Sequence, residues 1–218
     1  MADRASDVPP VFGPEFAAAF RELVLWCRDV RRFRPDGVDP ALVQSLIELA
    51  SHAPSVGNCQ PWRFVLVEDA ERRDAVRASF ERANADALKG YSGDKHALYA
   101  RLKLEGLKIA PVHIAVFADE KTERGAGLGR QTMPEMLRYS VVGAIQTLWL
   151  AARTQGLGLG WISILEPQVV TRVLDVPATW TLVAYLCLGR PTEDHLDPEL
   201  ERHGWEPRAA LDDLILKR

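Results

Sequence analysis

The sequence predicts an α+β protein with one mixed sheet surrounded by helices. Helical patterns outnumber strand patterns along the 218 residues, in the order helix, helix, strand, helix, helix, strand, helix, strand, helix, strand. The strands do not alternate with helices regularly enough for a doubly wound parallel sheet. Since 47% of the residues are hydrophobic, the chain has enough apolar side chains for one core, and we expect a single domain over residues 15–218. Residues 1–14 are polar and proline-rich, so we expect a flexible tail.

The first elements follow from apolar spacing and helix caps. Apolar residues at helical spacing predict a helix over residues 15–26. Asp39 is a good N-cap for a second helix over residues 40–53, which should end before a proline. A strand is expected over residues 62–68, followed by a polar helix over residues 69–88.

The middle of the chain is harder to interpret. Residues 91–105 are charged and glycine-containing yet keep several leucines, which predicts a helical lid over a site; an ordinary solvated connection fits the pattern nearly as well. A strand is predicted over residues 111–118. Three alternate glycines in residues 121–131 indicate a mobile loop. Their spacing is a weak dinucleotide-binding fingerprint, because no βαβ unit with an acid at the right distance follows.

The last third of the chain contains the longest predicted helix. It covers residues 134–155, presents a wide apolar face and ends at Gly156, a natural C-cap. A strand over residues 159–165, a short helix over 167–174 and a strand over 181–188 follow. The charged segment beyond residue 191 carries few apolar residues and is not expected to fold alone.

Composition excludes several classes of function. A net charge of −3 argues against a general nucleic-acid binder. The three cysteines are widely spaced and show no metal-ligand spacing, so we expect no metal site and a reducing compartment. The longest apolar run, residues 141–152, is too short to span a bilayer. We therefore expect a soluble, cytoplasmic protein that binds neither membrane nor nucleic acid.

An arginine-rich segment, residues 27–34, is the strongest indication of a ligand. It holds four arginines and one acid, Asp29. Guanidinium groups bind phosphate oxygens in a planar, bidentate way, so the segment predicts a phosphate site. Asp29 would repel a phosphate and must either pair with an arginine or face another group. A surface ion-pair cluster is the alternative interpretation of the segment.

A second segment, residues 51–64, closes a helix and opens a strand. Its small and amide side chains can hydrogen-bond a planar polar ligand. Together the two segments resemble the nitroreductase-like flavoprotein family, whose Arg-Arg-Ser-x-Arg motif meets the FMN phosphate and whose Ser-x-x-Asn-x-Gln-Pro-Trp loop meets the flavin. The resemblance extends from about Phe16 to about Pro207. It implies a nitroreductase-like fold and a homodimer with exchanged C-terminal tails.

Three details resemble one branch of that family, the 5,6-dimethylbenzimidazole synthases. They are Asp29 in place of the usual serine, the run Lys103-Leu104-Glu105-Gly106, and the run from Gly160 to Leu165. The resemblance implies that Asp29 and Ser163 are catalytic. The residues it assigns to FMN are Arg28, Asp29, Val30, Arg31, Ser55, Asn58, Gln60, Leu104, Ser163 and Arg190. Cys27 stands where the family usually has a second arginine, and Arg32 is interpreted as a surface residue.

The function implied by the resemblance is fragmentation of reduced FMN by molecular oxygen. The products would be 5,6-dimethylbenzimidazole, the lower ligand of cobalamin, and erythrose 4-phosphate. Reduced FMN would then be a substrate, supplied by a separate NAD(P)H-flavin reductase. Two alternatives stay open: an NAD(P)H-dependent FMN nitroreductase, and a non-catalytic flavin carrier or sensor. For Asp29, the residues alone favour a salt bridge, whereas the resemblance favours proton transfer. For Ser163, the alternative is a hydroxyl bonded to nearby backbone.

Overall fold

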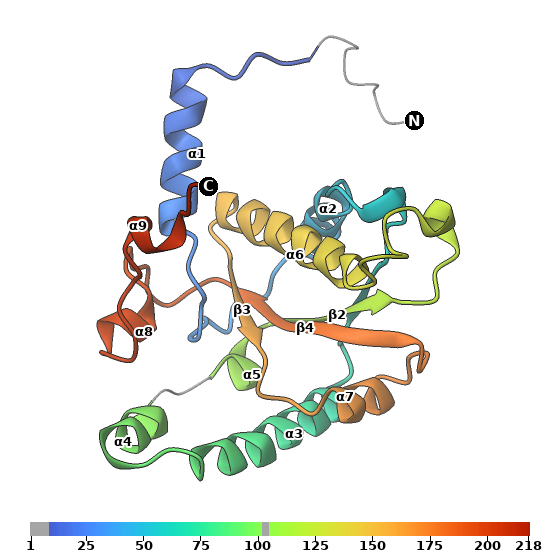
Figure 1. Cartoon of the computed structure of the whole chain (residues 1–218). Coiled ribbons are helices and arrows are strands. Elements are labelled where there is room, and N and C mark those ends of the chain that lie inside the picture. The colour runs from blue at the N-terminus through green and yellow to red at the C-terminus, as the bar shows by residue number, and fades with distance from the viewer. Residues whose placement is uncertain (1–8, 102–104) are drawn as a thin grey trace.

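A computed structural model describes residues 9–101 and 105–218 of the chain (Figure 1). Its α-helices are α1 (Pro14–Trp26), α2 (Pro40–Ala50), α3 (Ala70–Leu88), α4 (Gly93–Arg101), α5 (Gly106–Ile109), α6 (Met136–Thr154), α7 (Pro167–Val173), α8 (Glu199–Arg202) and α9 (Leu211–Leu214). Its strands are β1 (Trp62–Leu66), β2 (Val112–Asp119), β3 (Gly158–Ile162) and β4 (Trp180–Gly189), and its 3₁₀ turns are η1 (Val56–Asn58) and η2 (Arg124–Gly127).

The four strands form one sheet in the order β1-β2-β4-β3. All three strand pairs are antiparallel, so the prediction of an α+β fold is confirmed, but parallel pairing, expected for a mixed sheet, is not found among the described strands. The long helical connections allow a returning strand to run in either direction, so sequence alone does not determine the direction.

Helices cover both faces of the sheet and make three layers (Figure 1). On one face α2 and α6 pack against Ile114, Val116 and Leu186. On the other, α3, α5 and α7 pack against Ala115, Phe117 and other buried side chains. Alternate residues of β2 therefore enter different cores, and this explains why the strand is apolar almost throughout.

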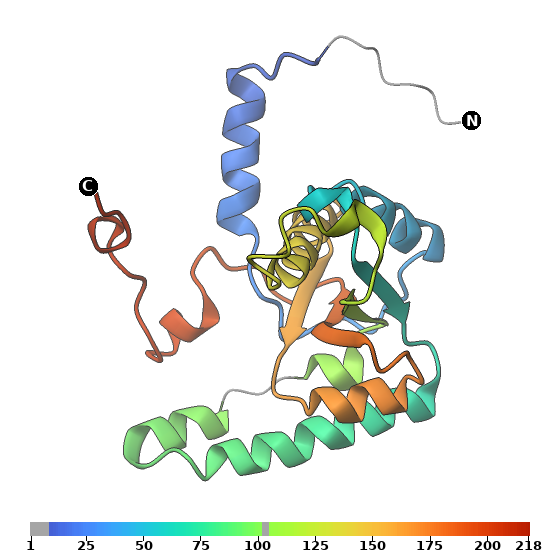
Figure 2. The same cartoon turned by 45° about the vertical axis from the view of Figure 1, so that its right-hand side comes forward.

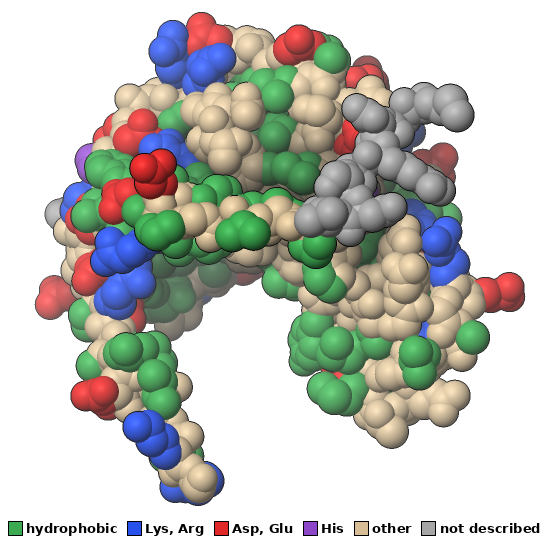
Figure 3. All heavy atoms as spheres, turned by 90° about the horizontal axis from the view of Figure 1, so that it is seen from above, with side chains coloured by type: hydrophobic (Ala, Val, Ile, Leu, Met, Phe, Trp, Pro, Cys, Tyr) green, Lys and Arg blue, Asp and Glu red, His purple; other side chains and the backbone are tan. Residues whose placement is uncertain are grey.

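Helix α1 and the C-terminal segment extend away from these layers (Figures 1 and 2). No residue of α1 is buried, and Phe16 and Phe20 are 52% and 49% exposed. Figure 3 shows hydrophobic side chains around a wide hollow that the described chain leaves open. Helix α1 contacts α6, yet it keeps several exposed apolar residues. Solitary exposed apolar residues are ordinary, but several on one helix indicate an interaction surface.

Most predicted elements agree with the structure to within a few residues, and the differences have local causes. The second helix ends at Ala50 rather than at residue 53, and the strand expected over residues 159–165 ends at Ile162. Pairing of β3 with β4 ends at the Ile162–Tyr185 pair, and after Ile162 the chain turns toward α7. Of the proposed lid, α4 is helical, whereas residues 102–104 lie outside the described residues.

Candidate functional site

The arginine segment lies along the edge of the sheet. The Val30 amide donates to the Leu159 carbonyl at 2.8 Å, and the Arg34 amide donates to the Arg190 carbonyl at 2.8 Å. Phe33 is buried between these two points and forms an isolated bridge with Pro191. The segment is therefore held by main-chain bonds to β3 and to the end of β4, which orients its side chains.

Gly160 makes this close contact possible. A Cβ on Gly160 would lie 2.2 Å from the Val30 carbonyl oxygen, much closer than any real Cβ contact. A side chain there would push the arginine segment away from β3. The Gly160-Trp161 pair, part of the run that resembles the synthase branch, thus has a physical role. The glycine lets the arginine segment approach β3, and the Trp161 amide binds the segment.

Asp29 is held by that next residue. One carboxylate oxygen of Asp29 accepts a hydrogen bond from the Trp161 backbone amide at 3.0 Å, and the other lies 3.5 Å from Arg31 Nε. Loss of solvation raises the pKa of Asp29 above its usual range, outweighing the Trp161 amide and Arg31, which lower it; Glu199 raises it further. A carboxyl group with these neighbours can hold a proton more readily than a free aspartate.

Arg31 is the residue best suited to bind an anion. Its side chain is 12% exposed, and its Nε is buried without a hydrogen-bond partner in the described chain. A buried polar donor without a partner is costly, so an acceptor from a ligand would stabilise it. This observation fits the phosphate of FMN.

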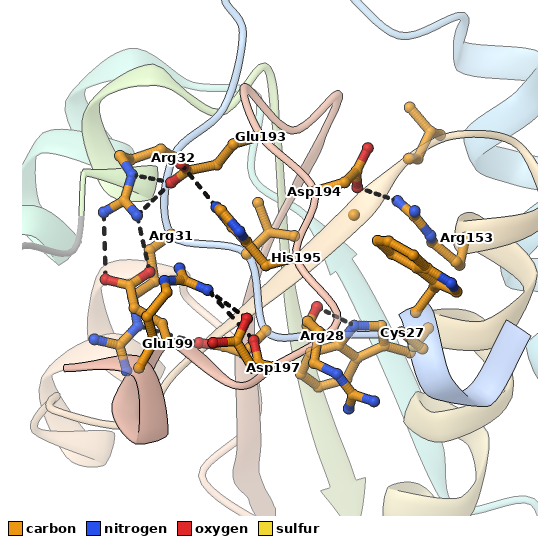
Figure 4. Close-up of a pocket in the computed structure, with 17 residues that line it drawn as sticks. Cys27, Arg28, Arg31, Arg32, Arg153, Glu193, Asp194, His195, Asp197 and Glu199 are labelled. Atoms are coloured by element: carbon orange, nitrogen blue, oxygen red, sulfur yellow. Dashed lines mark hydrogen bonds and ion pairs between the residues drawn. The ribbon is translucent and has the colours of Figure 1, made fainter. Parts of the chain in front are cut away.

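Arg28 and Arg32 have protein partners already. The Arg28 guanidinium donates to the Leu196 carbonyl at 2.9 Å and to the carbonyls of Val24 and Leu25 near the end of α1. Arg32 forms ion pairs with Glu193 and Glu199. Arg32, which the sequence suggests is a surface residue, has a side chain that is 32% exposed, and it also binds the C-terminal segment beside the site, as Figure 4 shows.

The site borders an open pocket of about 560 Å³. Its walls come from the C-terminal end of α1, the arginine segment, α6 and α8, and they include Arg28, Asp29, Arg31, Trp149 and Glu199. The Trp149 indole N–H donates to the Arg28 carbonyl at 3.4 Å, and its ring packs near Trp161. Sequence reasoning missed Trp149, Glu193 and Glu199, because their spacing from the arginine segment carries no local signal.

The loop containing Ser55, Asn58 and Gln60 is built differently. Ser55 Oγ accepts from the Gln60 amide at 3.0 Å, and Asn58 Oδ1 accepts from Gln60 Nε2 at 3.2 Å. Asn58 and Gln60 have backbone φ values of 52° and 47°, which residues other than glycine rarely adopt. Strain of this kind often accompanies a binding role. None of the three residues borders the pocket of the arginine segment.

The remaining predicted site residues are scattered. Ser163 follows β3, is exposed, and its hydroxyl has no hydrogen bond to another described residue. Arg190 is exposed at the end of β4, and its Nη1 would lie 3.7 Å from a Cβ on Gly156. Val30 packs against β3. Leu104 lies outside the described residues. No group of acidic, histidine or cysteine side chains in the described chain is arranged to hold a metal ion.

The cysteines and the helices of the described chain show neither disulfide bonds nor membrane spans. Cys27, Cys59 and Cys187 are free thiols, and burial raises the pKa of Cys187 to about 12. Among the described helices, none is long and apolar enough to cross a membrane.

Comparisons with known proteins agree with this geometry. Residues 24–190 match the model of the family described as "Nitroreductase family". The chain is 56% identical to the "5,6-dimethylbenzimidazole synthase" of Rhodospirillum rubrum over 199 residues, which cover 91% of this chain and 94% of that protein. It is 45% identical over 188 residues to a protein of the same name from Rhodobacter capsulatus, covering 86% and 91% of the two chains.

A solved structure shows the same fold. Oxidised iodotyrosine deiodinase bound to FMN and 3-iodo-L-tyrosine superposes with a TM-score of 0.72 at 24% identity, over 90% of this chain and 97% of that chain. At this identity the likeness concerns the fold alone. The family model covers the arginine segment, the loop with Ser55 and all four strands, and the two relatives extend over most of the chain. The chain therefore belongs to the nitroreductase family.

Proposed function

We propose that this chain is a 5,6-dimethylbenzimidazole synthase, an oxidoreductase that fragments reduced FMN with molecular oxygen to 5,6-dimethylbenzimidazole and erythrose 4-phosphate. The observation that carries the proposal is the placement of Asp29, held by the Trp161 amide beside Arg31, whose buried Nε lacks a partner. An identity of 56% to a synthase across nine-tenths of the chain supports it.

In this proposal FMN is bound as a substrate by its phosphate. Arg31 supplies a buried donor, Arg28 a second positive charge, and Arg190 a third from the end of β4. Charge-assisted hydrogen bonds to phosphate are strong and directional, so they orient the ring system relative to the protein. Val30 and Leu104 are proposed as apolar contacts, and Ser55, Asn58 and Gln60 as polar contacts to the ribityl chain or ring edge.

Asp29 and Ser163 are proposed to act on protons. Reduced FMN supplies the carbon skeleton and the electrons that react with oxygen. Loss of solvation raises the pKa of Asp29, so its carboxyl group holds a proton more readily than an ordinary aspartate and is suited to exchange one with the substrate. The exposed Ser163 hydroxyl lies just beyond the strand that binds Asp29, where it can orient a polar group of the substrate.

We also propose an obligate homodimer with a flavin site between the subunits. The loop with Ser55 and Gln60 lies apart from the arginine pocket, so both can contact one flavin if they come from different subunits. The apolar face of α1 and the exposed Leu211 and Leu214 of the C-terminal tail would be covered in such a dimer. The residues beyond Trp205 are the part of the tail proposed to be exchanged.

The proposed enzyme works in the cytoplasm with a separate NAD(P)H-flavin reductase. The decisive test is incubation of the purified protein with chemically reduced FMN, followed by addition of oxygen and mass analysis for 5,6-dimethylbenzimidazole. Product in amounts that scale with enzyme, and none with reduced riboflavin or with heat-treated protein, is the expected result.

The same preparation distinguishes the alternatives. Rapid oxidation of NADH or NADPH without an added reductase, with no benzimidazole, would identify an FMN nitroreductase. Tight FMN binding with neither activity would identify a flavin carrier or sensor.

A further inference from the structure

The charges around the phosphate arginines are balanced by the chain's own C-terminal segment. Residues 193–199, here called the acidic tail segment, contribute Glu193, Asp194, Asp197 and Glu199 to the pocket (Figure 4). Together with Asp29, five carboxylates of the described residues line this pocket, and five arginines line it as well. The pocket beside the arginine-rich segment is therefore close to neutral in formal charge.

The pairing is selective rather than uniform. Arg32 Nε donates to Glu193 at 2.7 Å, and the two terminal nitrogens of Arg32 donate to the two oxygens of Glu199 at 3.3 and 3.0 Å. Glu199 is 10% exposed in this fork-to-fork geometry. Hydrogen bonds from His195 and from Arg32 lower the pKa of Glu193 to about 2, so its carboxylate is charged at neutral pH. Arg32 is thus fully engaged by two carboxylates.

Arg28 and Arg31 keep their charge available. Arg28 donates only to backbone carbonyls, which are neutral. Arg31 has Asp29 at 3.5 Å as its ion-pair partner, and its Nε has no hydrogen bond. These two guanidinium groups face one carboxylate between them, so they keep positive charge for the single phosphate of a monoester.

The space beside Arg32 is also too small for a second phosphate group. The cavity between the arginine segment and the acidic tail segment is about 40 Å³, room for no more than a few waters. Arg28, Asp29 and Arg31 line both this cavity and the larger, open pocket, whereas Arg32 and Glu193 line only the small cavity. A second phosphate group placed beside Arg32 would have to displace Glu193 and Glu199.

We propose that Glu193 and Glu199 are specificity-determining residues: by holding Arg32 they leave the site suited to one phosphate monoester and unsuited to the diphosphate of a flavin dinucleotide. This inference rests on the proposed function in taking a flavin phosphate as ligand. It assigns to the acidic tail segment a role in choosing between FMN and FAD.

The test is a set of binding titrations with chemically reduced FMN, FAD and riboflavin, done without oxygen. The Glu193→Gln/Glu199→Gln double variant should bind FAD about tenfold or more tightly than the wild type, with riboflavin affinity unchanged. Inorganic pyrophosphate should become a better competitor of FMN relative to inorganic phosphate. Glu201→Gln, which removes a charge from the same helix but makes no ion pair with Arg32, should behave as wild type.

A third substitution separates charge selection from simple anchoring. In the triple variant with Arg32→Gln added, the gain for FAD should disappear, because the freed guanidinium is its cause. If the double variant instead loses affinity for all flavins alike, or keeps the wild-type ratio of FAD to FMN affinity, the proposal is wrong. Failure of the wild type to bind FMN more tightly than riboflavin would overturn the proposed function itself, whatever the variants do.

Discussion

The carboxylate of Asp29 and the backbone amide of Trp161, 132 residues apart in the chain, are joined by a hydrogen bond of 3.0 Å. This bond places the acid at the edge of the sheet, with one carboxylate oxygen on the Trp161 amide and the other 3.5 Å from Arg31 Nε. The donor is a main-chain group, so any residue that keeps the path of β3 can provide it, provided that Gly160 lets the arginine segment approach.

The first prediction concerns Asp29. Asp29→Asn keeps an oxygen that can accept from the Trp161 amide, so flavin affinity and melting temperature should stay near wild type. Formation of 5,6-dimethylbenzimidazole should fall by about 10²–10⁴-fold, the usual contribution of general acid–base catalysis. All three quantities are measured on one preparation. A lowered melting temperature with a full yield of product would show that Asp29 is a salt-bridge residue only.

The second prediction concerns the phosphate. Arg31→Ala and Arg190→Ala should each weaken binding of reduced FMN by about 1.5–3 kcal/mol, and discrimination against riboflavin should fall with it. Isothermal titration without oxygen measures both affinities. Arg34→Ala is the matched control, since Arg34 is exposed and paired with Asp36 at 2.6 Å. Wild-type FMN affinity in both variants would remove these residues from the phosphate site.

The third prediction concerns the approach of two segments. Gly160→Ala would place a Cβ 2.2 Å from the Val30 carbonyl, so the arginine segment must shift. Overpacking of this kind costs about 1–3 kcal/mol of stability, and FMN binding should weaken as well. Urea unfolding and flavin titration report the two effects. Gly37→Ala, where a Cβ meets nothing within 4 Å, should change neither; equal effects at both positions would refute the explanation.

The fourth prediction concerns oligomeric state. The exposed Phe16 and Phe20 of α1 should lie in a subunit interface, and an obligate dimer of this kind buries about 2,000 Å² or more. Sedimentation should show a dimer at micromolar concentration, and Phe16→Asp with Phe20→Asp should dissociate or unfold it. Glu22→Gln on the same helix serves as the control. A folded wild-type monomer at that concentration would contradict the proposal.

The fifth prediction concerns pH and stability. His113 is 2% exposed and its Nδ1 lies 3.0 Å from the Tyr185 hydroxyl; burial and Arg73 lower its pKa to about 4. Below about pH 6.5 the unfolded chain binds a proton at this histidine while the native state does not, so acid favours unfolding. Stability should be greatest above pH 6.5 and decline toward pH 4, by up to about 3 kcal/mol from this group.

Urea unfolding from pH 7.5 to pH 4 measures this decline. The His113→Gln variant should show a shallower slope over the same range, because other groups still titrate but this one does not. Parallel curves for wild type and variant would show that His113 does not contribute.

The sequence by itself determined the local features of this protein. Periodicity and caps placed α1, α3 and α6 to within a few residues, because apolar spacing and an N-cap such as Asp69 act over one or two turns of chain. The arginine segment predicted an anion-binding site, since its arginines are neighbours in the sequence. The same local motifs were sufficient to indicate the nitroreductase family.

Only the tertiary structure decided how these pieces meet. The antiparallel direction of every strand pair depends on how long helical connections pack, which no single segment encodes. Asp29 accepts its hydrogen bond from Trp161, and Arg32 pairs with Glu193 and Glu199, all more than a hundred residues away in the chain. The sequence does not distinguish an arginine that is free to bind a phosphate from one that is already paired with a carboxylate. The role of an arginine depends on which charges the fold brings within hydrogen-bond distance, and that is a property of packing rather than of sequence spacing.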